Sequence, residues 1–235
     1  MKINNTDISA FSAKQFTFET GHNSLTNASE WAAGSAVPYF ARNDIGFASY
    51  TLTLVVKGQN RQEIMRNCSD ILALLIDPVD LTVDGFSHKY KVVLDGFSHT
   101  ERAQRTYHLL TLEFHGYEYG ATVTEEGETS ITIVNPGNLV SPAIVTVTPQ
   151  ADITSVTLSG ICRNSRTGEG IDVVIPDLEE GKPVILDGVS GLTTQDGDPK
   201  NVTMWTLPTL LPGSNTITCN NAFVTVTVEC IPLYI

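Results

Sequence analysis

Between residues 131 and 228 the chain consists of short β-patterned segments separated by turn signals, and none of them has a helical pattern. Asn135-Pro136-Gly137, Gly168-Glu169-Gly170 and Asp196-Gly197-Asp198-Pro199 supply residues that tight turns favour. The apolar segments span residues 131–134, 143–148, 156–158, 171–175, 184–186, 202–205, 217–219 and 223–228. Eight short strands without a helix predict a β-sandwich or jelly roll.

The last strands follow a turn with a clear physical basis. In Pro212-Gly213, proline presets the φ of the first turn position, and glycine takes the positive φ that follows. Residues 215–219 then begin a strand. Asn220-Asn221 predicts a two-residue turn into strand 223–228, so we expect a terminal hairpin.

The first half mixes strands with one helix. Residues 49–56 alternate in the period-two pattern of a strand. Asn60 is the predicted N-cap, with Glu63 placed as in a capping box. We predict a helix over residues 60–77 that ends at Asp77-Pro78, because a residue before proline avoids helical φ and ψ. Its apolar stripe comprises Ile64, Met65, Cys68, Ile71, Leu72, Leu75 and Ile76.

The pentapeptide Asp-Gly-Phe-Ser-His occurs twice after this helix, at residues 84–88 and 95–99. Each Asp-Gly pair predicts a turn of a β-meander with strands at 81–83, 90–94 and 107–114. An eleven-residue period is too short for a solenoid module.

A change of composition predicts two domains. Residues 1–120 hold ten Lys and Arg against thirteen Asp and Glu (net −3), whereas residues 121–235 hold four against thirteen (net −9). Residues 120–130 form a polar, acidic break between the two halves. We therefore expect a helix-containing domain at 1–124 and a β-only domain at 125–235.

Composition also excludes several classes of protein. The apolar content of 41% argues against disorder. The net charge of −12 disfavours sequence-specific binding of nucleic acid, because an acidic chain repels phosphates. The longest apolar run, residues 71–76, predicts no membrane insertion. No secretory signal is visible, so we expect synthesis in a cytoplasm and four reduced, structural cysteines: Cys68, Cys162, Cys219 and Cys230.

The search for chemistry predicts no catalytic residue, no metal site and no cofactor. Metalloprotease, nucleophile-elbow and phosphate-loop motifs are absent. His108 and His115 fall on opposite faces of one strand and cannot share a metal. His88 and His99 follow equivalent turns, where surface positions are favoured over a ligand pair.

The remaining polar and aromatic candidates also have structural explanations. Asp196-Gly197-Asp198 is predicted to be a plain turn instead of a calcium loop. The acidic residues at 125–128 and 179–180 are expected on solvated loops. Trp205 ends an alternating segment, so burial is favoured over a sugar-stacking role. The predicted loop at 21–41 carries Trp31, Tyr39 and Phe40 and is our candidate for an interface; the binding residues themselves are unknown.

Three stretches of the chain resemble the siphophage distal tail (Dit-type) proteins. The first is the capped helix ending in Leu74-Leu75-Ile76-Asp77-Pro78, followed by Asp84-Gly85 and a strand at 90–94. The second is the strand at 107–114. The third pairs an entry resembling "N-x-G-x-x-x-x-P-x-I" at 135–144 with an ending resembling "L-P-x-L-x-P-G-x-N-x-I" at 207–217.

This resemblance implies a mainly β protein with an N-terminal ring-forming domain and a C-terminal galectin-like sandwich. It implies a non-enzymatic structural component of a phage or prophage baseplate, synthesised in the bacterial host cytoplasm and located at the virion tail tip. The expected partners are five further copies in a homo-hexamer, the tail tube protein, and the tail-tip hub or tail-fibre protein. The second domain is expected to hold a receptor-binding protein or a host saccharide. A lectin-like carbohydrate-binding protein is the alternative.

Overall fold

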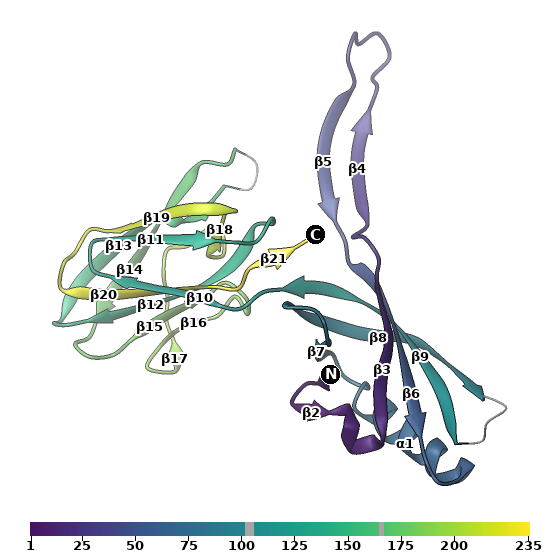
Figure 1. The fold of residues 1–235 in the computed structure, drawn as a ribbon. Helices are drawn as coiled ribbons and strands as arrows, with labels where there is room; N and C mark the ends of the chain where they lie inside the picture. The colour runs from purple at the N-terminus through teal and green to yellow at the C-terminus, as the bar shows by residue number, and fades with distance from the viewer. Residues whose placement is uncertain (102–105, 165–166) are drawn as a thin grey trace. The chain divides into compact units, whose positions relative to one another are not determined.

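The computed structural model describes residues 1–101, 106–164 and 167–235. They form two compact units, Met1–Glu118 together with Ile235, and Tyr119–Tyr234 (Figure 1). The acidic stretch predicted to be a break contains strand β10 (Val123–Gly127), which pairs with β20 (Val224–Cys230) of the second unit. The predicted boundary after residue 124 therefore falls inside a strand.

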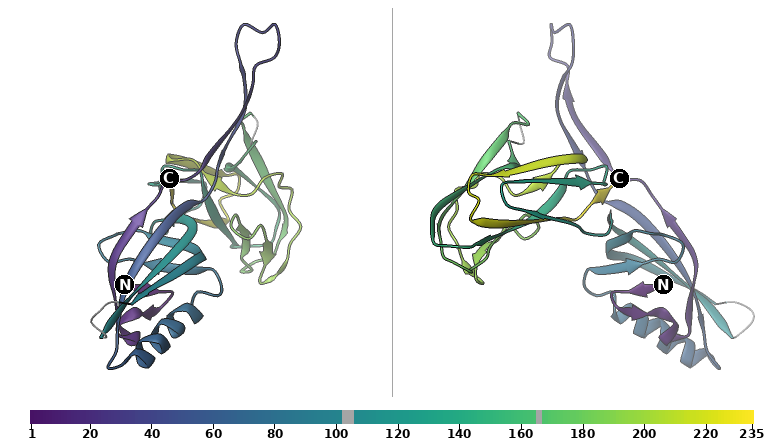
Figure 2. Two further views of the ribbon diagram at one scale, coloured as in Figure 1. Left: turned by 90° about the vertical axis from the view of Figure 1, so that its right-hand side faces the viewer. Right: turned by 60° about the vertical axis from the view of Figure 1, so that its left-hand side comes forward.

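The first unit is a sheet with strand order β2-β1-β7-β8-β9-β6-β3. Helix α1 (Arg61–Ala73) lies along one face of this sheet (Figure 2). A short 3₁₀ helix, η1 (Ile8–Phe11), leads into β3. The strands are β1 (Lys2–Ile3), β2 (Thr6–Asp7), β3 (Ala13–Thr20), β6 (Ala48–Lys57), β7 (Val79–Thr82), β8 (Lys89–Glu101) and β9 (Tyr107–Tyr119).

The predicted alternation at residues 49–56 produces the central strand β6. Leu52 and Leu54 lie fully buried on the face that α1 covers, opposite Leu112 and Leu110 of β9. The helix contributes Ile64 and Ile71 to the same core. Side chains at alternate positions of a strand point to opposite faces, so the other face of β6 remains partly accessible.

Helix α1 begins as predicted and ends earlier than predicted. The side chain of Asn60 accepts the backbone N–H of Glu63 at 3.0 Å. Glu63 reaches back one residue further than a capping box requires and accepts the N–H of Gln59. The helix stops at Ala73, so the predicted end at 77 is wrong. Met65 and Ile76 are 45% and 80% exposed and do not belong to its buried stripe.

The two Asp-Gly pairs behave differently. Gly85 has a φ of +87° and lies between β7 and β8, where a turn was predicted. Asp95-Gly96 lies within the continuous strand β8, so the second predicted turn is wrong. The same pentapeptide adopts two conformations because its position in the sheet, and not its own residues, decides whether the strand continues.

The predicted loop at 21–41 contains one strand and the start of a second, which together form a β-ribbon. Strands β4 (Leu25–Glu30) and β5 (Tyr39–Ile45) pair with each other in a two-stranded sheet. We call this ribbon the arm; it extends away from the main sheet of its unit (Figure 1). Every residue of β4 is exposed. The side chain of Phe40 lies outside the described residues.

The second unit is a sandwich of two antiparallel sheets, as predicted. One sheet has the order β10-β20-β12-β15-β16-β17, with β18 pairing beside β12, and the other has the order β11-β19-β13-β14. Val145 and Val226 of the first sheet share a core with Leu158 and Ile217 of the second. The further strands are β11 (Ser130–Asn135), β12 (Ser141–Pro149), β13 (Ile153–Arg163), β14 (Gly170–Leu178), β15 (Val184–Asp187), β16 (Thr193–Gln195), β17 (Asp198–Pro199), β18 (Thr209–Leu210), β19 (Gly213–Cys219) and β21 (Leu233–Tyr234).

The predicted terminal hairpin is absent. Strand β19 pairs with β11 and β13, whereas β20 pairs with β10 and β12 in the opposite sheet. Asn220-Asn221 therefore carries the chain across the core from one sheet to the other. The predicted strand at 202–205 is reduced to a single bridge between Thr203 and Val174 of β14.

Candidate functional site

Two histidines of the first unit each contact a different carboxylate. His88 Nδ1 lies 2.5 Å from Glu118 Oε1, and His115 Nδ1 lies 2.5 Å from Asp95 Oδ1. His88 and His99, which were considered as a possible pair, are therefore not brought together in one site. His115 points to the open face of β9, opposite to the core face that His108 shares with Leu110.

His99 and His108 form the third contact, with Nε2 of His99 2.6 Å from Nδ1 of His108. One ring donates a proton and the other accepts it, which requires at least one neutral imidazole. His108 is 2% exposed. Burial, reinforced by the adjacent His108, lowers the pKa of His99. The contact occupies one nitrogen of each ring and joins a half-buried histidine of β8 to a buried one of β9.

The other reactive groups are also held in structural roles. All four cysteines are buried with free thiols, and burial raises the pKa of Cys230 to about 11. A protonated buried thiol is a poor nucleophile. Burial likewise raises the pKa of Tyr50 to about 12, in an aromatic cluster with Phe18 and Tyr90.

The acidic candidates do not converge. Asp196-Gly197 forms the two-residue turn between β16 and β17, with φ values of 50° and 90°, so the turn prediction is confirmed. Of the acidic residues at 125–128, Glu125 and Glu126 lie on β10 instead of a loop. Within the described ranges, no group of three His, Cys, Asp or Glu side chains is placed to hold a metal ion. Nor does any helix there have the length and apolarity to span a membrane.

Trp205 departs most clearly from the sequence-based expectation. Its side chain is 82% exposed, so the prediction of burial is wrong. Val202 and Met204 pack against the core of the second unit, and the intervening Thr203 is exposed. The alternation was identified correctly, but Trp205 falls on the outer side of it.

Two asparagines in the motifs that resemble Dit-type sequences stabilise turns by hydrogen bonds. Asn215 is 4% exposed; its Nδ2 donates to the carbonyls of Leu211 and Gly213, and its Oδ1 accepts the N–H of Leu211. Asn135 is equally buried, donates to the carbonyls of Leu139 and Leu210, and accepts the N–H of Gly137. The sequence predicted a turn at Asn135 and the start of a strand at Asn215, but it did not predict that both side chains are buried and hold a turn by hydrogen bonds.

No protein-family model matches the chain, and no curated protein matches it. Solved structures, in contrast, do match the chain. The crystal structure of the SPP1 Dit (gp 19.1) protein, described as a paradigm of the hub adsorption apparatus in phages infecting Gram-positive bacteria, matches with a TM-score of 0.76 at 14% identity. That match covers 99% of this chain and 98% of that one. A chain of the phage P2 baseplate in its activated conformation with Ca matches with a TM-score of 0.51 at 9% identity, covering 95% and 92%. The resemblance to Dit-type proteins is thus confirmed at the level of the fold.

Proposed function

We propose that this protein is a non-enzymatic structural component of the distal tail of a bacteriophage or prophage. The observation that carries the proposal is the match to the SPP1 Dit protein over 99% of this chain, which includes both units. Fold alone does not define a function, so the role needs a direct test.

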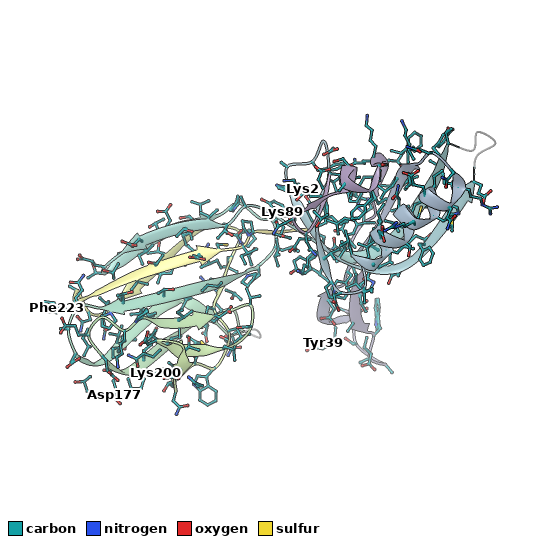
Figure 3. All side chains as sticks on the ribbon, turned by 90° about the horizontal axis from the view of Figure 1, so that it is seen from below. Lys2, Tyr39, Lys89, Asp177, Lys200 and Phe223 are labelled. Carbon is teal, nitrogen blue, oxygen red and sulfur yellow. The ribbon has the colours of Figure 1, made fainter. Side chains whose placement is uncertain are left out.

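We assign ring assembly to the first unit and its arm. An isolated two-stranded ribbon is marginally stable in water, yet β4 and β5 pair only with each other in the described topology. Tyr39 is 70% exposed on the arm (Figure 3), and Leu25 and Val37 are exposed as well. A neighbouring copy would cover these side chains. Contacts of this head-to-tail kind close into rings, and the Dit-type resemblance sets the expected number of subunits at six.

A second surface of the same unit suits such a contact. A shallow, mainly apolar hollow of about 340 Å³ lies on the open side of β3, β6 and β9, lined by Phe16, Val55, Tyr107 and Leu109 together with one charged residue, Lys57. Phe16 is 64% exposed there. The arm and this hollow are different surfaces, as a heterologous ring interface requires.

Light scattering coupled to size exclusion, with negative-stain microscopy of the same sample, tests the ring. We expect closed hexamers from the full chain. Replacing residues 25–45 with a short Gly-Ser turn should give monomers, whereas Phe223→Ser, an equally exposed aromatic in the second unit, should leave the ring intact. A full chain that stays monomeric at high concentration contradicts ring assembly.

In this proposal the ring joins the tail tube protein on one side and the tail-tip hub or tail-fibre protein on the other. The second unit serves as a docking platform for a receptor-binding or accessory protein. The protein is made in the host cytoplasm and ends at the tail tip. Antibody labelling of particles, viewed by electron microscopy, should mark one end of the tail; labelling along the tube or at the head would contradict the assignment.

The alternative function is that of a lectin-like protein, and the exposed side chain of Trp205 is the observation that favours it. A lectin needs the sandwich but has no use for the arm. A monomer in solution that binds glycans would therefore support the alternative over the ring.

A further inference from the structure

The arm continues the pairing of β3 and β6 without a change of register. Thr20 pairs with Tyr50 at the end of β3, and Leu25 pairs with Ile45 at the start of β4. Five positions separate these pairs on each strand, from 20 to 25 and from 50 to 45, so no extra residue lies between sheet and arm. We call the connecting residues 21–24 and 46–49 the neck (Figure 1).

Hydrogen bonds join the two strands of the neck. The N–H of Gly21 donates to the carbonyl of Ser49 at 2.7 Å, and the N–H of Gly46 donates to the carbonyl of Ser24 at 2.7 Å. The side-chain amide of Asn23 donates to the carbonyl of Gly46 at 3.0 Å. Both backbone groups of Gly46 are therefore engaged, and the neck continues the ladder of the main sheet into the arm.

The two glycines of the neck provide space for the facing strand. Their φ values lie outside the left-handed region that favours glycine. A Cβ on Gly21 would lie 2.3 Å from the hydroxyl oxygen of Ser49, and a Cβ on Gly46 would lie 2.1 Å from that of Ser24. Each glycine therefore makes room for the serine opposite it, and the two strands approach closely at the neck.

An aromatic contact braces the neck against the neighbouring strand. Phe47 is 61% exposed, and its ring packs on that of His115 of β9 with 5.1 Å between the centroids. His115 Nδ1 lies 2.5 Å from Oδ1 of Asp95 on β8. His115 is also the partner of Ser49 in the ladder of β6 and β9, so Phe47 is its diagonal neighbour on the open face. This contact connects the base of the arm to two strands of the main sheet.

We propose that the neck holds the arm in one fixed direction and that ring closure depends on it, with Phe47 and His115 as positioning residues. The inference rests on the ring assembly proposed above. The far end of the six-residue strand β4 lies about 20 Å from the neck, at about 3.3 Å per residue. A rotation of about 10° at the neck displaces that end by about 3.5 Å.

Such a displacement is large compared with the tolerance of a packed interface. A radial gap of about 1 Å already forfeits up to about half of the dispersion attraction between two surfaces. A head-to-tail contact closes into a ring only when each copy meets the next at one rotation angle. An arm without its brace would therefore still contact a neighbouring copy, but it would not define that angle.

A hinge that lets the arm swing is the competing explanation. Small residues are common at hinges, which absorb large changes in φ and ψ. In the neck, however, the backbone groups of Gly46 are hydrogen-bonded and the register of the two strands is continuous. Swinging the arm would break these bonds.

Pulsed electron spin resonance on the full chain tests the fixed direction. Labels at Ser29→Cys on β4 and Arg66→Cys on α1 report one distance, since the four native cysteines are buried. Labelled chain is diluted with unlabelled chain so that each ring carries one labelled copy. We expect a single narrow distance in the parent. Phe47→Ala and His115→Ala should each shift or broaden it by about 3 Å or more, as a rotation of about 10° would.

Two further variants control for the nature of the change. Phe97→Ala removes a similarly exposed aromatic of β8 and should leave the distance unchanged. Gly46→Val should alter the distance, because its side chain competes with the Ser24 hydroxyl for the same space. Gly46→Ser combined with Ser24→Gly exchanges the two residues and should keep the parent distance, since the two positions of an antiparallel pair are equivalent.

Size exclusion and negative-stain microscopy of the same samples test ring closure. Phe47→Ala should give open assemblies of mixed size with an unchanged melting temperature. The proposal is overturned by a broad distance in the parent, by an unchanged distance in both Phe47→Ala and Gly46→Val, or by parent-sized closed rings of Phe47→Ala. A monomeric parent with one narrow distance would refute ring assembly and leave the fixed direction of the arm standing; closed hexamers with a broad distance would do the reverse.

Discussion

Replacing Asn215 with alanine should destabilise the second unit far more than a surface substitution does. The buried amide satisfies three backbone groups of the turn at 211–213, at distances of 2.8 to 3.0 Å. Alanine leaves the carbonyls of Leu211 and Gly213 and the N–H of Leu211 without these partners. Each buried hydrogen bond contributes about 1 kcal/mol net, and an unsatisfied group costs about 1–3 kcal/mol. Water reaches the exposed side of the turn and offsets part of this, so we expect a loss of about 2–4 kcal/mol.

Hydrogen exchange with peptide resolution measures this loss within the full chain. Core amides of β12 and β20 should exchange roughly 30- to 700-fold faster at the expected destabilisation. Amides of β6 and β9 in the first unit provide an internal reference that should not change. The matched control is Asn220→Ala, since exposed Asn220 accepts a single backbone N–H, from Thr157. Equal exchange in the two variants would refute the clamp.

Three further predictions follow from single contacts. Trp205→Ala should lower the free energy of unfolding by under about 1 kcal/mol in a thermal melt, whereas loss of a buried aromatic costs about 3–5 kcal/mol. Unfolding of the second unit in this variant would show that the side chain is packed. Asn60→Ala should cost about 1 kcal/mol and fray the start of α1, as seen by circular dichroism and exchange of the Glu63 amide; an unchanged amide would contradict the cap. The folded-state pKa of His99 is lowered from 6.5, so the unfolded chain binds more protons than the folded one, and stability falls as pH drops through and below 6.5. His99→Gln should reduce this pH dependence, measured as the difference in free energy of unfolding between urea titrations at pH 7.5 and 5. An unchanged difference would exclude the His99–His108 pair as its source.

Features that depend on neighbouring residues were predictable from the sequence. The Asn60 cap, the positive φ of Gly213 and the turn at Asp196-Gly197 each follow from the chemistry of one or two side chains. So do the alternation of β6 and the mainly β composition of the second unit. At these positions the backbone has few accessible conformations, and the sequence supplies a residue that permits the conformation observed.

Features that depend on distant partners were not predictable. Asn220-Asn221 provides a turn, but whether β20 returns to the same sheet or crosses to the other depends on pairing with β10 and β12. Asp95-Gly96 stays extended because β8 continues along the sheet. The arm was missed because β4 has no buried face and therefore no apolar alternation for the sequence to display.

The same contrast explains how short motifs indicated a fold that is shared at only 14% identity. Several positions of these motifs are ones where the backbone constrains the residue. A Cβ on Gly137 would lie 2.5 Å from the carbonyl oxygen of Leu233, and Gly213 has a φ of +87°. Asn135 and Asn215 bind backbone groups that no apolar residue can satisfy. Core positions accept many apolar side chains of similar volume, so they carry little information about which β-sandwich is formed. Residues that hold turns by buried hydrogen bonds, such as Asn135 and Asn215, do carry it.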